Sequence, residues 1–195
     1  VMAYALGLPI GMLLVVTDTE GIKPNAVLNR LVGGVVNVLR SVPFIILLVA
    51  VIPVTRAIVG TSIGSTATIV PLVIAAAPFV ARMVESAAKE VDRGVIEASL
   101  SMGASTLQIV CKVMLPEAKP SLIVGAAIAT TTILGYSAMS GFVGGGGLGT
   151  IAVNYGYYRS ETDIMLVMVA ILVLIVQVFQ EIGNLISNKS DKRIR

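Results

Sequence analysis

The segment TDIMLVMVAILVLIVQVFQEIGNLIS, residues 162–187, carries charged side chains only at Asp163 and Glu181. A helix needs about 20 predominantly apolar residues to cross the hydrocarbon core of a bilayer, which is about 30 Å thick. The segment exceeds that length and keeps both charges away from its centre. It therefore predicts a helix that spans a membrane.

Four further apolar segments precede this one, and all but the first are also long enough to span a bilayer. A soluble chain can bury one such run as a core helix, but not five in series. We therefore expect a single all-α domain over residues 1–195, a polytopic membrane protein with about five transmembrane helices. The four segments are Val1–Val16, Leu31–Val54, Thr66–Val84 and Ala118–Ser140.

The first segment, Val1–Val16, is short for a spanning helix. It has neither a charged n-region nor a small-residue cleavage site, so it does not read as a signal peptide. We interpret it as a membrane helix that lacks its beginning. Prolines within the later segments are compatible with membrane helices, because neighbouring helices satisfy the freed carbonyl groups. Pro43 and Pro78 are interpreted as kinks, with a hinge role as the alternative.

The composition argues against most soluble-enzyme chemistry. Of the 195 residues, 56% are hydrophobic and 13% are charged, whereas soluble domains have roughly 45–50% apolar and about 25% charged residues. The single cysteine, Cys111, excludes a disulfide within the chain and a cysteine-based zinc site. The chain has no histidine, which is the commonest general base and metal ligand. We expect no catalytic residue, cofactor, metal site or nucleic-acid partner for this chain.

The positions of lysine and arginine predict the orientation, because cytoplasmic loops of membrane proteins carry an excess of both. Of the 14 such residues, only Arg56 and Arg159 fall in the two connections on one side. The others lie near the first connection, between the third and fourth segments, and in the tail 188–195. We therefore expect the connection before the fourth segment and the C-terminus to be cytoplasmic.

The long connection at about 90–117 has an apolar stripe at helical spacing, which predicts short amphipathic helices. Gly103 interrupts the stripe and can adopt the positive φ that ends a helix. Ser105 or Thr106 can then cap the next helix, and Pro116 is expected to close it and start the following membrane segment. From periodicity alone, the stripe packs on its own membrane helices, lies in the lipid interface, or binds a partner. Its members are Ile96, Leu100, Leu107, Val110 and Met114.

The same connection contains EASLSMGASTLQIVCKVMLP, residues 97–116, which resembles the cytoplasmic loop signature of bacterial ABC importer permeases. That signature is Glu-Ala-Ala, three residues, Gly, nine residues, Ile, one residue and Leu-Pro. Two of its positions differ here, Ser99 for the second alanine and Val113 for the isoleucine. The resemblance implies that this coupling loop, residues 90–117, docks on a separate ATPase subunit. The matching residues are Glu97, Ala98, Gly103, Leu115 and Pro116.

Three other stretches, residues 39–49, 60–85 and 135–149, resemble the permease subunits of bacterial methionine ABC importers. The resemblance implies a multi-pass subunit of the bacterial cytoplasmic membrane that forms a homodimer. It further implies two ATPase subunits, an extracytoplasmic substrate-binding protein and D- or L-methionine as cargo. The alternatives are a permease for another amino acid or an osmolyte, and a membrane scaffold that recruits a cytosolic partner.

No Gly-x-x-x-x-Gly-Lys-Ser/Thr motif occurs, so the ATP-binding loop of an ATPase is not present in this sequence. Gly144, Gly146 and Gly149 do satisfy Gly-x-Gly-x-x-Gly. We reject a dinucleotide site, because that motif needs a preceding strand and these glycines follow a membrane segment. They are instead expected to contact the external binding protein or to form a flexible connection.

The fourth segment is rich in hydroxyl and small side chains, which permit close helix packing and also suit a substrate pathway. Thr131 and Ser137 are candidate pathway residues, and Met139 is the candidate gate if two copies meet around an axis. Methionine is flexible and apolar, as a dry gate requires. The alternative for Met139 is ordinary packing. Arg82 and Glu85, three residues apart, are expected to form a structural pair on one helix.

Overall fold

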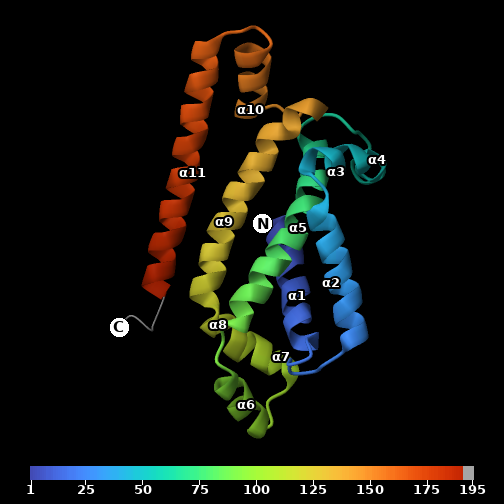
Figure 1. The fold of residues 1–195 in the computed structure, drawn as a ribbon, viewed down its shortest axis with the longest axis vertical. Coiled ribbons are helices and arrows are strands. Elements are labelled where there is room, and N and C mark those ends of the chain that lie inside the picture. The colour runs from blue at the N-terminus through green and yellow to red at the C-terminus, as the bar shows by residue number, and fades with distance from the viewer. Residues whose placement is uncertain (191–195) are drawn as a thin grey trace.

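The protein is helical in its described part, which in this computed structural model is residues 1–190 apart from the side chain of Phe142. The prediction of an all-α chain is therefore confirmed. Figure 1 shows a bundle whose longer helices run along the molecule and whose short helices gather at its two ends. The elements are α1 (Met2–Thr17), α2 (Ala26–Ser41), α3 (Phe44–Ala50), α4 (Ile52–Val59), α5 (Ser65–Lys89), α6 (Arg93–Ser101), α7 (Thr106–Ile109), the π-helical turn η1 (Val110–Met114), α8 (Leu115–Glu117), α9 (Lys119–Ala138), the 3₁₀ turn η2 (Met139–Val143), α10 (Leu148–Ile151), the π-helical turn η3 (Ala152–Tyr157) and α11 (Thr162–Ser190).

Three of these helices, α5, α9 and α11, are long and apolar enough to cross a membrane. A fourth span results if α2 and α3 are counted together, although they meet at a bend of 106°. The helix α1, with 16 residues, is apolar but shorter than a full span. The expectation that Leu31–Val54 forms one helix is therefore wrong, since the chain starts α2 earlier and turns sharply after Ser41.

The sharp turn follows from Pro43. The proline ring disfavours helical backbone at the preceding residue, and Val42 is extended, with ψ of 124°. The chain therefore leaves α2 at Val42 and begins α3 in a new direction. Pro71 and Pro78 lie inside α5, which continues through both without a break.

Glycines let α1 and α5 lie almost backbone to backbone. A Cβ atom on Gly7 would lie 2.8 Å from the carbonyl oxygen of Ala77, and one on Gly11 would lie 2.4 Å from that of Ala81. Small residues at helix interfaces allow this close approach in membranes, where packing drives association. The side chains of Val80 and Ala81 are fully buried at this contact.

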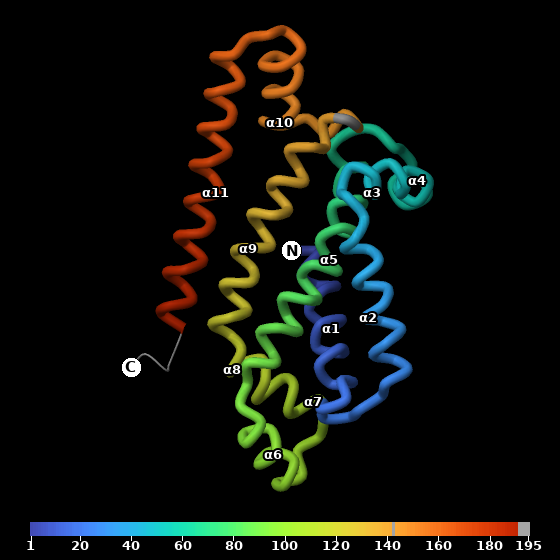
Figure 2. The backbone as a smooth tube through the Cα atoms, viewed as in Figure 1, coloured from blue at the N-terminus to red at the C-terminus, as the bar shows by residue number. Residues whose placement is uncertain are grey.

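The other helices extend the bundle sideways. Figure 2 shows α11 running alongside α9, with the N-terminus about midway along the long axis. Gly183 of α11 faces Ala127 of α9, where an added Cβ would lie 2.3 Å from the alanine Cβ. The hydroxyl of Ser187 donates to the carbonyl oxygen of Pro120 at 3.0 Å. These contacts fix α11 to the start of α9.

The connection between α1 and α2, residues 18–25, lies at the same end of the molecule as α6 and α7 (Figure 1). The opposite end holds α3, α4, α10 and the turn into α11. Arg56 and Arg159 therefore lie at the end away from the coupling loop, as the sequence predicted. Of the basic tail, Lys192, Arg193 and Arg195 lie outside the described residues.

Candidate functional site

The coupling loop contains two short helices joined by a glycine turn, in the predicted order. Asp92 caps α6, accepting a hydrogen bond from the Gly94 N–H at 2.7 Å. Gly103 has φ of +80° and ends the turn that follows α6. Ser105 caps α7 and forms a capping box, in which Gln108 accepts from the Ser105 N–H at 2.8 Å. Of the two candidate caps, the structure thus selects Ser105.

Pro116 does not close the second helix, contrary to the expectation from sequence. The helical backbone runs from Thr106 through the π-helical turn η1 and continues to Glu117. Pro116 lies within this helical run, just after the π-helical turn η1 and one residue before the run ends. Pro120, which lies in the first turn of α9, is the proline that starts the following membrane helix.

The predicted apolar stripe divides between the protein core and the surface. Met114 is buried, and Ile96 and Val110 pack partly buried against the same cluster, together with Met12 and Val84 of the membrane helices. The sequence missed Ile109, which is fully buried in this cluster. Other apolar side chains on the loop remain exposed. They are Val95, Leu100, Met102 and Leu107.

The signature residues also have two kinds of environment. Ser99 is buried and donates its hydroxyl to the Val95 carbonyl oxygen at 2.8 Å. Val113 and Leu115 pack partly buried against the core. The remaining four, Glu97, Ala98, Gly103 and Pro116, are exposed. The structure therefore keeps part of the signature for anchoring the loop and leaves the other part available to a partner.

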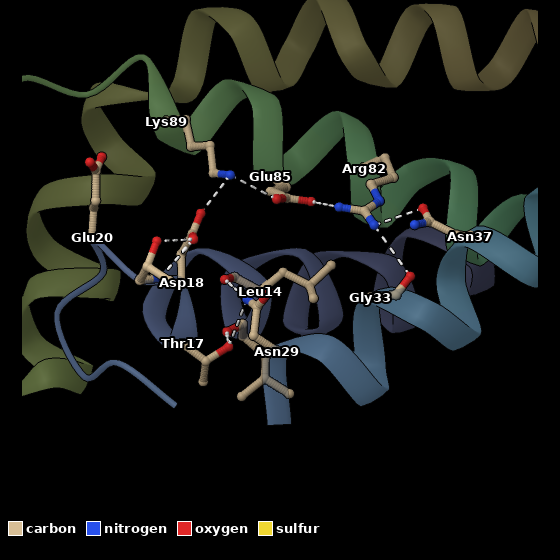
Figure 3. Close-up of polar contacts among 12 residues, drawn as sticks. Leu14, Thr17, Asp18, Glu20, Asn29, Gly33, Asn37, Arg82, Glu85 and Lys89 are labelled. Atoms are coloured by element: carbon tan, nitrogen blue, oxygen red, sulfur yellow. Dashed lines mark hydrogen bonds and ion pairs between the residues drawn. The ribbon is translucent and has the colours of Figure 1, made fainter. Parts of the chain in front are cut away.

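Ion pairs connect the end of α5 and the start of the coupling loop to the connection between α1 and α2. Asp18 Oδ2 lies 2.7 Å from Lys89 Nζ at the end of α5, as Figure 3 shows. Glu20 pairs with Arg93, the first residue of α6. Sequence spacing gave no sign of either pair. A groove of about 540 Å³ lies between the two segments, and Glu97 contributes to its lining.

The hydrogen bond from Lys89 is the main cause that holds the pKa of Asp18 below its ordinary value. A bond from the Thr19 N–H to the Asp18 carboxylate, at 2.7 Å, acts in the same direction. Because the folded-state pKa is lowered, the ionised Asp18 carboxylate stabilises the folded state at every pH above its ordinary pKa. This stabilisation is lost only as the pH falls through the lowered pKa. The Asp18–Lys89 pair is therefore fully ionised at neutral pH.

Arg82 and Glu85 form the expected pair on α5, with 2.5 Å between Nη1 and Oε2. Arg82 also reaches α2, where Nη2 donates to Asn37 Oδ1 at 2.7 Å and to the Gly33 carbonyl oxygen at 3.3 Å. Glu85 in turn pairs with Lys89 at 2.9 Å. The pair is thus one part of a polar chain that joins two helices (Figure 3).

The glycine run at the other end of the molecule is packed. Gly144 and Gly146 have positive φ. A Cβ on Gly149 would lie 2.2 Å from the carbonyl oxygen of Ala138, so the chain here presses against the end of α9. The carbonyl oxygen of Gly145 accepts a hydrogen bond from Ser65 of α5 at 3.1 Å. These contacts hold the run in place between two membrane helices and argue against a loosely attached connection.

Two of the candidate pathway residues, Ser137 and Met139, lie at the same end of α9, and Thr131 lies nearer its middle. Met139 is 46% exposed and begins η2, and Ser137 is also exposed. Thr131 donates its hydroxyl to the Ile128 carbonyl oxygen at 2.9 Å, and lines a groove of about 290 Å³ between α9 and α11. Gln177 of α11 lines the same groove. The three candidates therefore lie along one helix and do not form a closed pocket within a single chain.

The family model described as "Binding-protein-dependent transport system inner membrane component" matches residues 7–195. The chain belongs to this family. Among curated members, "Probable D-methionine transport system permease protein MetI" of Vibrio cholerae is 52% identical over 192 residues, which is 98% of this chain and 85% of the relative. "Methionine import system permease protein MetP" of Bacillus subtilis is 42% identical over 181 residues, which is 93% and 82% of the two chains.

Solved structures have the same architecture. A chain of "Inward facing conformations of the MetNI methionine ABC transporter: CY5 SeMet soak crystal form" matches with a TM-score of 0.96 at 51% identity, covering 98% of this chain and 88% of that one. A chain of "Crystal structure of an amino acid ABC transporter with histidines" matches with a TM-score of 0.73 at 19% identity, covering 96% and 87%, which shows the fold alone. The protein is therefore a membrane-embedded permease subunit of the binding-protein-dependent kind.

Proposed function

We propose that this permease subunit carries methionine across the bacterial cytoplasmic membrane. The observation that carries the proposal is the match to the MetNI chain, with a TM-score of 0.96 at 51% identity over nearly the whole chain. Relatives from Vibrio cholerae and Bacillus subtilis are also named for methionine transport. The scaffold alternative has no such support.

The subunit works, in this proposal, as a homodimer with two ATPase subunits and an extracytoplasmic substrate-binding protein. ATP is hydrolysed on the separate ATPase subunits, and this chain contributes no cofactor and no catalytic residue. The coupling loop, residues 90–117, faces the cytoplasm together with the C-terminus. The orientation is supported by the excess of lysine and arginine on this side. Docking on the ATPase subunits is supported by the exposed side chains of the loop, which include Glu97, Met102 and Leu107.

The glycine run at the other end is proposed to face outward and to contact the binding protein. Its support is the fixed backbone of Gly144 and Gly146, both exposed and both at positive φ. Gly149 is buried against α9 and holds the run in place. Exposed N–H and C=O groups on a run that is already held by contacts with its own chain bind a partner at little entropic cost.

The cargo is tested by uptake in vesicles that contain the permease, its ATPase subunits and its binding protein. Radiolabelled D- and L-methionine, other amino acids and glycine betaine are supplied one at a time, with and without ATP. We expect ATP-dependent accumulation of methionine above that of every other compound. Stronger uptake of a different amino acid or of betaine would show that the cargo is wrong while the transporter class holds.

A gate formed by Met139 from two copies is proposed to close the pathway near η2. Its support is the exposed position of Met139 at the end of α9, beside exposed Ser137. Met139→Ala shortens an apolar plug, so we expect methionine to leak out of loaded vesicles without ATP, and each ATP hydrolysed to move less methionine. Met168→Ala on α11 makes the same truncation elsewhere and serves as the control. Normal leak and normal uptake in Met139→Ala would leave Met139 with packing alone.

A further inference from the structure

The joint between α5 and the coupling helix α6 is bracketed by two ion pairs. Lys89 is the last residue of α5, and Arg93 is the first residue of α6. Each pairs with an acid of the connection between α1 and α2, Lys89 with Asp18 at 2.7 Å and Arg93 with Glu20. We call these four residues the ionic clamp. The clamp places both ends of the joint against one short segment of another part of the chain.

The clamp continues into the membrane helices as a chain of polar contacts. Lys89 Nζ also pairs with Glu85 Oε1 at 2.9 Å, and Glu85 Oε2 pairs with Arg82 at 2.5 Å. Arg82 then donates to Asn37 of α2 at 2.7 Å. Figure 3 shows this chain running along α5 from Lys89 to Arg82, with Asp18 directly after the end of α1 and Asn37 on α2. The contact of Lys89 with Asp18 holds the end of α5 near the end of α1. The contact of Arg82 with Asn37 holds α5 against α2.

The helices α1 and α2 are also bonded to each other beside the clamp. Asn29 of α2 donates its side-chain amide to the Leu14 carbonyl oxygen at 2.7 Å and to the Thr17 hydroxyl at 3.2 Å. Asp18 directly follows these residues at the end of α1. A displacement of the 18–25 connection is therefore transmitted to both helices at once.

We propose that Asp18 and Glu20 are positioning residues for energy coupling, which carry the displacement of α6 into α1 and α2 through Lys89 and Arg93. The inference rests on the proposed function, in which the ATPase subunits move α6. Without the clamp, α6 is joined to this side of the bundle by the short joint 90–92 and by the apolar contact of Ile96. With the clamp, α2 follows α6, and α2 leads to the bend before α3 at the opposite end.

The exposure of the clamp separates this role from a role in folding. The side chains of Arg93 and Glu20 are 69% and 66% exposed, and exposed pairs of this kind stabilise a folded chain only weakly. Reversing one charge therefore leaves the subunit folded. It replaces an attraction by a repulsion where α6 begins, and so disturbs the coupling geometry first.

The test uses the full complex in vesicles, with methionine uptake and ATP hydrolysis measured on the same samples. Glu20→Arg and Arg93→Glu each break one pair, and the double variant restores it with the charges exchanged. Glu20→Gln is the milder variant. Lys23→Glu is the control, because Lys23 lies exposed in the same connection and forms no ion pair within residues 1–190. We expect each single reversal to lower methionine moved per ATP by about fivefold, the upper range for an exposed pair.

Rescue distinguishes a positioning role from a merely structural one. The double variant is expected to return to within about twofold of the starting protein, while Lys23→Glu is unchanged. Unchanged uptake per ATP in the single reversals would overturn the proposal, as would a double variant no better than the singles. Loss of the ATPase subunits from Glu20→Arg would also overturn it, because Glu20 would then act in docking.

A second readout does not depend on the cargo. Ser41→Cys, in a Cys111→Ser background, places a thiol at the exposed end of α2. Its labelling by a membrane-impermeant maleimide is compared with and without ATP and vanadate. We expect ATP to change the labelling, and Arg93→Glu to reduce that change. Labelling that does not respond to ATP, or that responds equally in Arg93→Glu, rejects the clamp even if the cargo is not methionine.

Discussion

Replacing Gly11 with valine is expected to prevent α1 from packing on α5. A Cβ atom at Gly11 would lie 2.4 Å from the Ala81 carbonyl oxygen and 2.7 Å from the Val84 Cβ. The nearest atom belongs to the backbone of α5, so no rotamer change relieves the clash. Overpacking a core by a few atoms typically costs about 1–3 kcal/mol, and separating two helix backbones costs more. We expect Gly11→Val to accumulate poorly and to unfold at a clearly lower temperature in detergent.

Gly34→Ala is the matched control for this prediction. Gly34 also lies inside a helix, α2, but nothing lies within 4 Å of the position where its Cβ would be. Alanine is the better helix former by about 1 kcal/mol, so this variant is expected to match or slightly exceed the starting protein in stability. Equal unfolding temperatures for Gly11→Val and Gly34→Ala would show that α1 and α5 do not pack as described.

The sequence predicted the long helices because a bilayer imposes a length on them. Runs of about 20 apolar residues located α5, α9 and α11 to within a few residues of their ends. The same rule failed at Leu31–Val54, because a hydropathy count does not detect a change of direction. Pro43 was read as a kink, yet it marks a bend of 106°. The size of the bend depends on what α3 packs against, including the stack of Phe44 on Tyr136 at 4.7 Å, which links residues far apart in sequence.

Within the coupling loop, the sequence predicted the features that depend on neighbouring residues better than those that depend on long-range contacts. The positive φ of Gly103 and the cap at Ser105 depend on neighbours within a few residues, and both predictions are confirmed. The burial of Ile109 depends on α1 and α5, so the spacing of apolar residues within the loop did not predict it. The ionic clamp joins residues more than 70 positions apart, and a single sequence does not show which distant charged side chains lie close together. Pro116 was assigned a role that Pro120 performs, because either proline fits a helix start.

Replacing Gly103 with proline is expected to detach the ATPase subunits from the permease. Gly103 has φ of +80°, whereas the proline ring fixes φ near −65°. The Gly103 N–H also donates to the Leu100 carbonyl oxygen at 2.9 Å, and proline has no N–H to replace it. The turn between α6 and α7 must therefore rearrange at a cost of about 3 kcal/mol or more. The measurement is the amount of ATPase subunit that co-purifies with a tagged permease.

A graded series at Gly103 separates the turn geometry from a general loss of folding. Gly103→Ala keeps the N–H, but the left-handed backbone destabilises the turn by about 1–2 kcal/mol. Gly103→Asn destabilises it less, because asparagine tolerates that region. We expect ATPase retention to fall in the order Asn, Ala, Pro, with the unfolding temperature of the membrane helices nearly constant, because nothing packs on the Gly103 position. Glu97→Arg leaves the turn intact and reverses an exposed charge on α6, so its loss of ATPase would locate the contact itself. Equal retention in Gly103→Pro, Glu97→Arg and the starting protein would mean that the ATPase docks elsewhere, whatever the ionic clamp does.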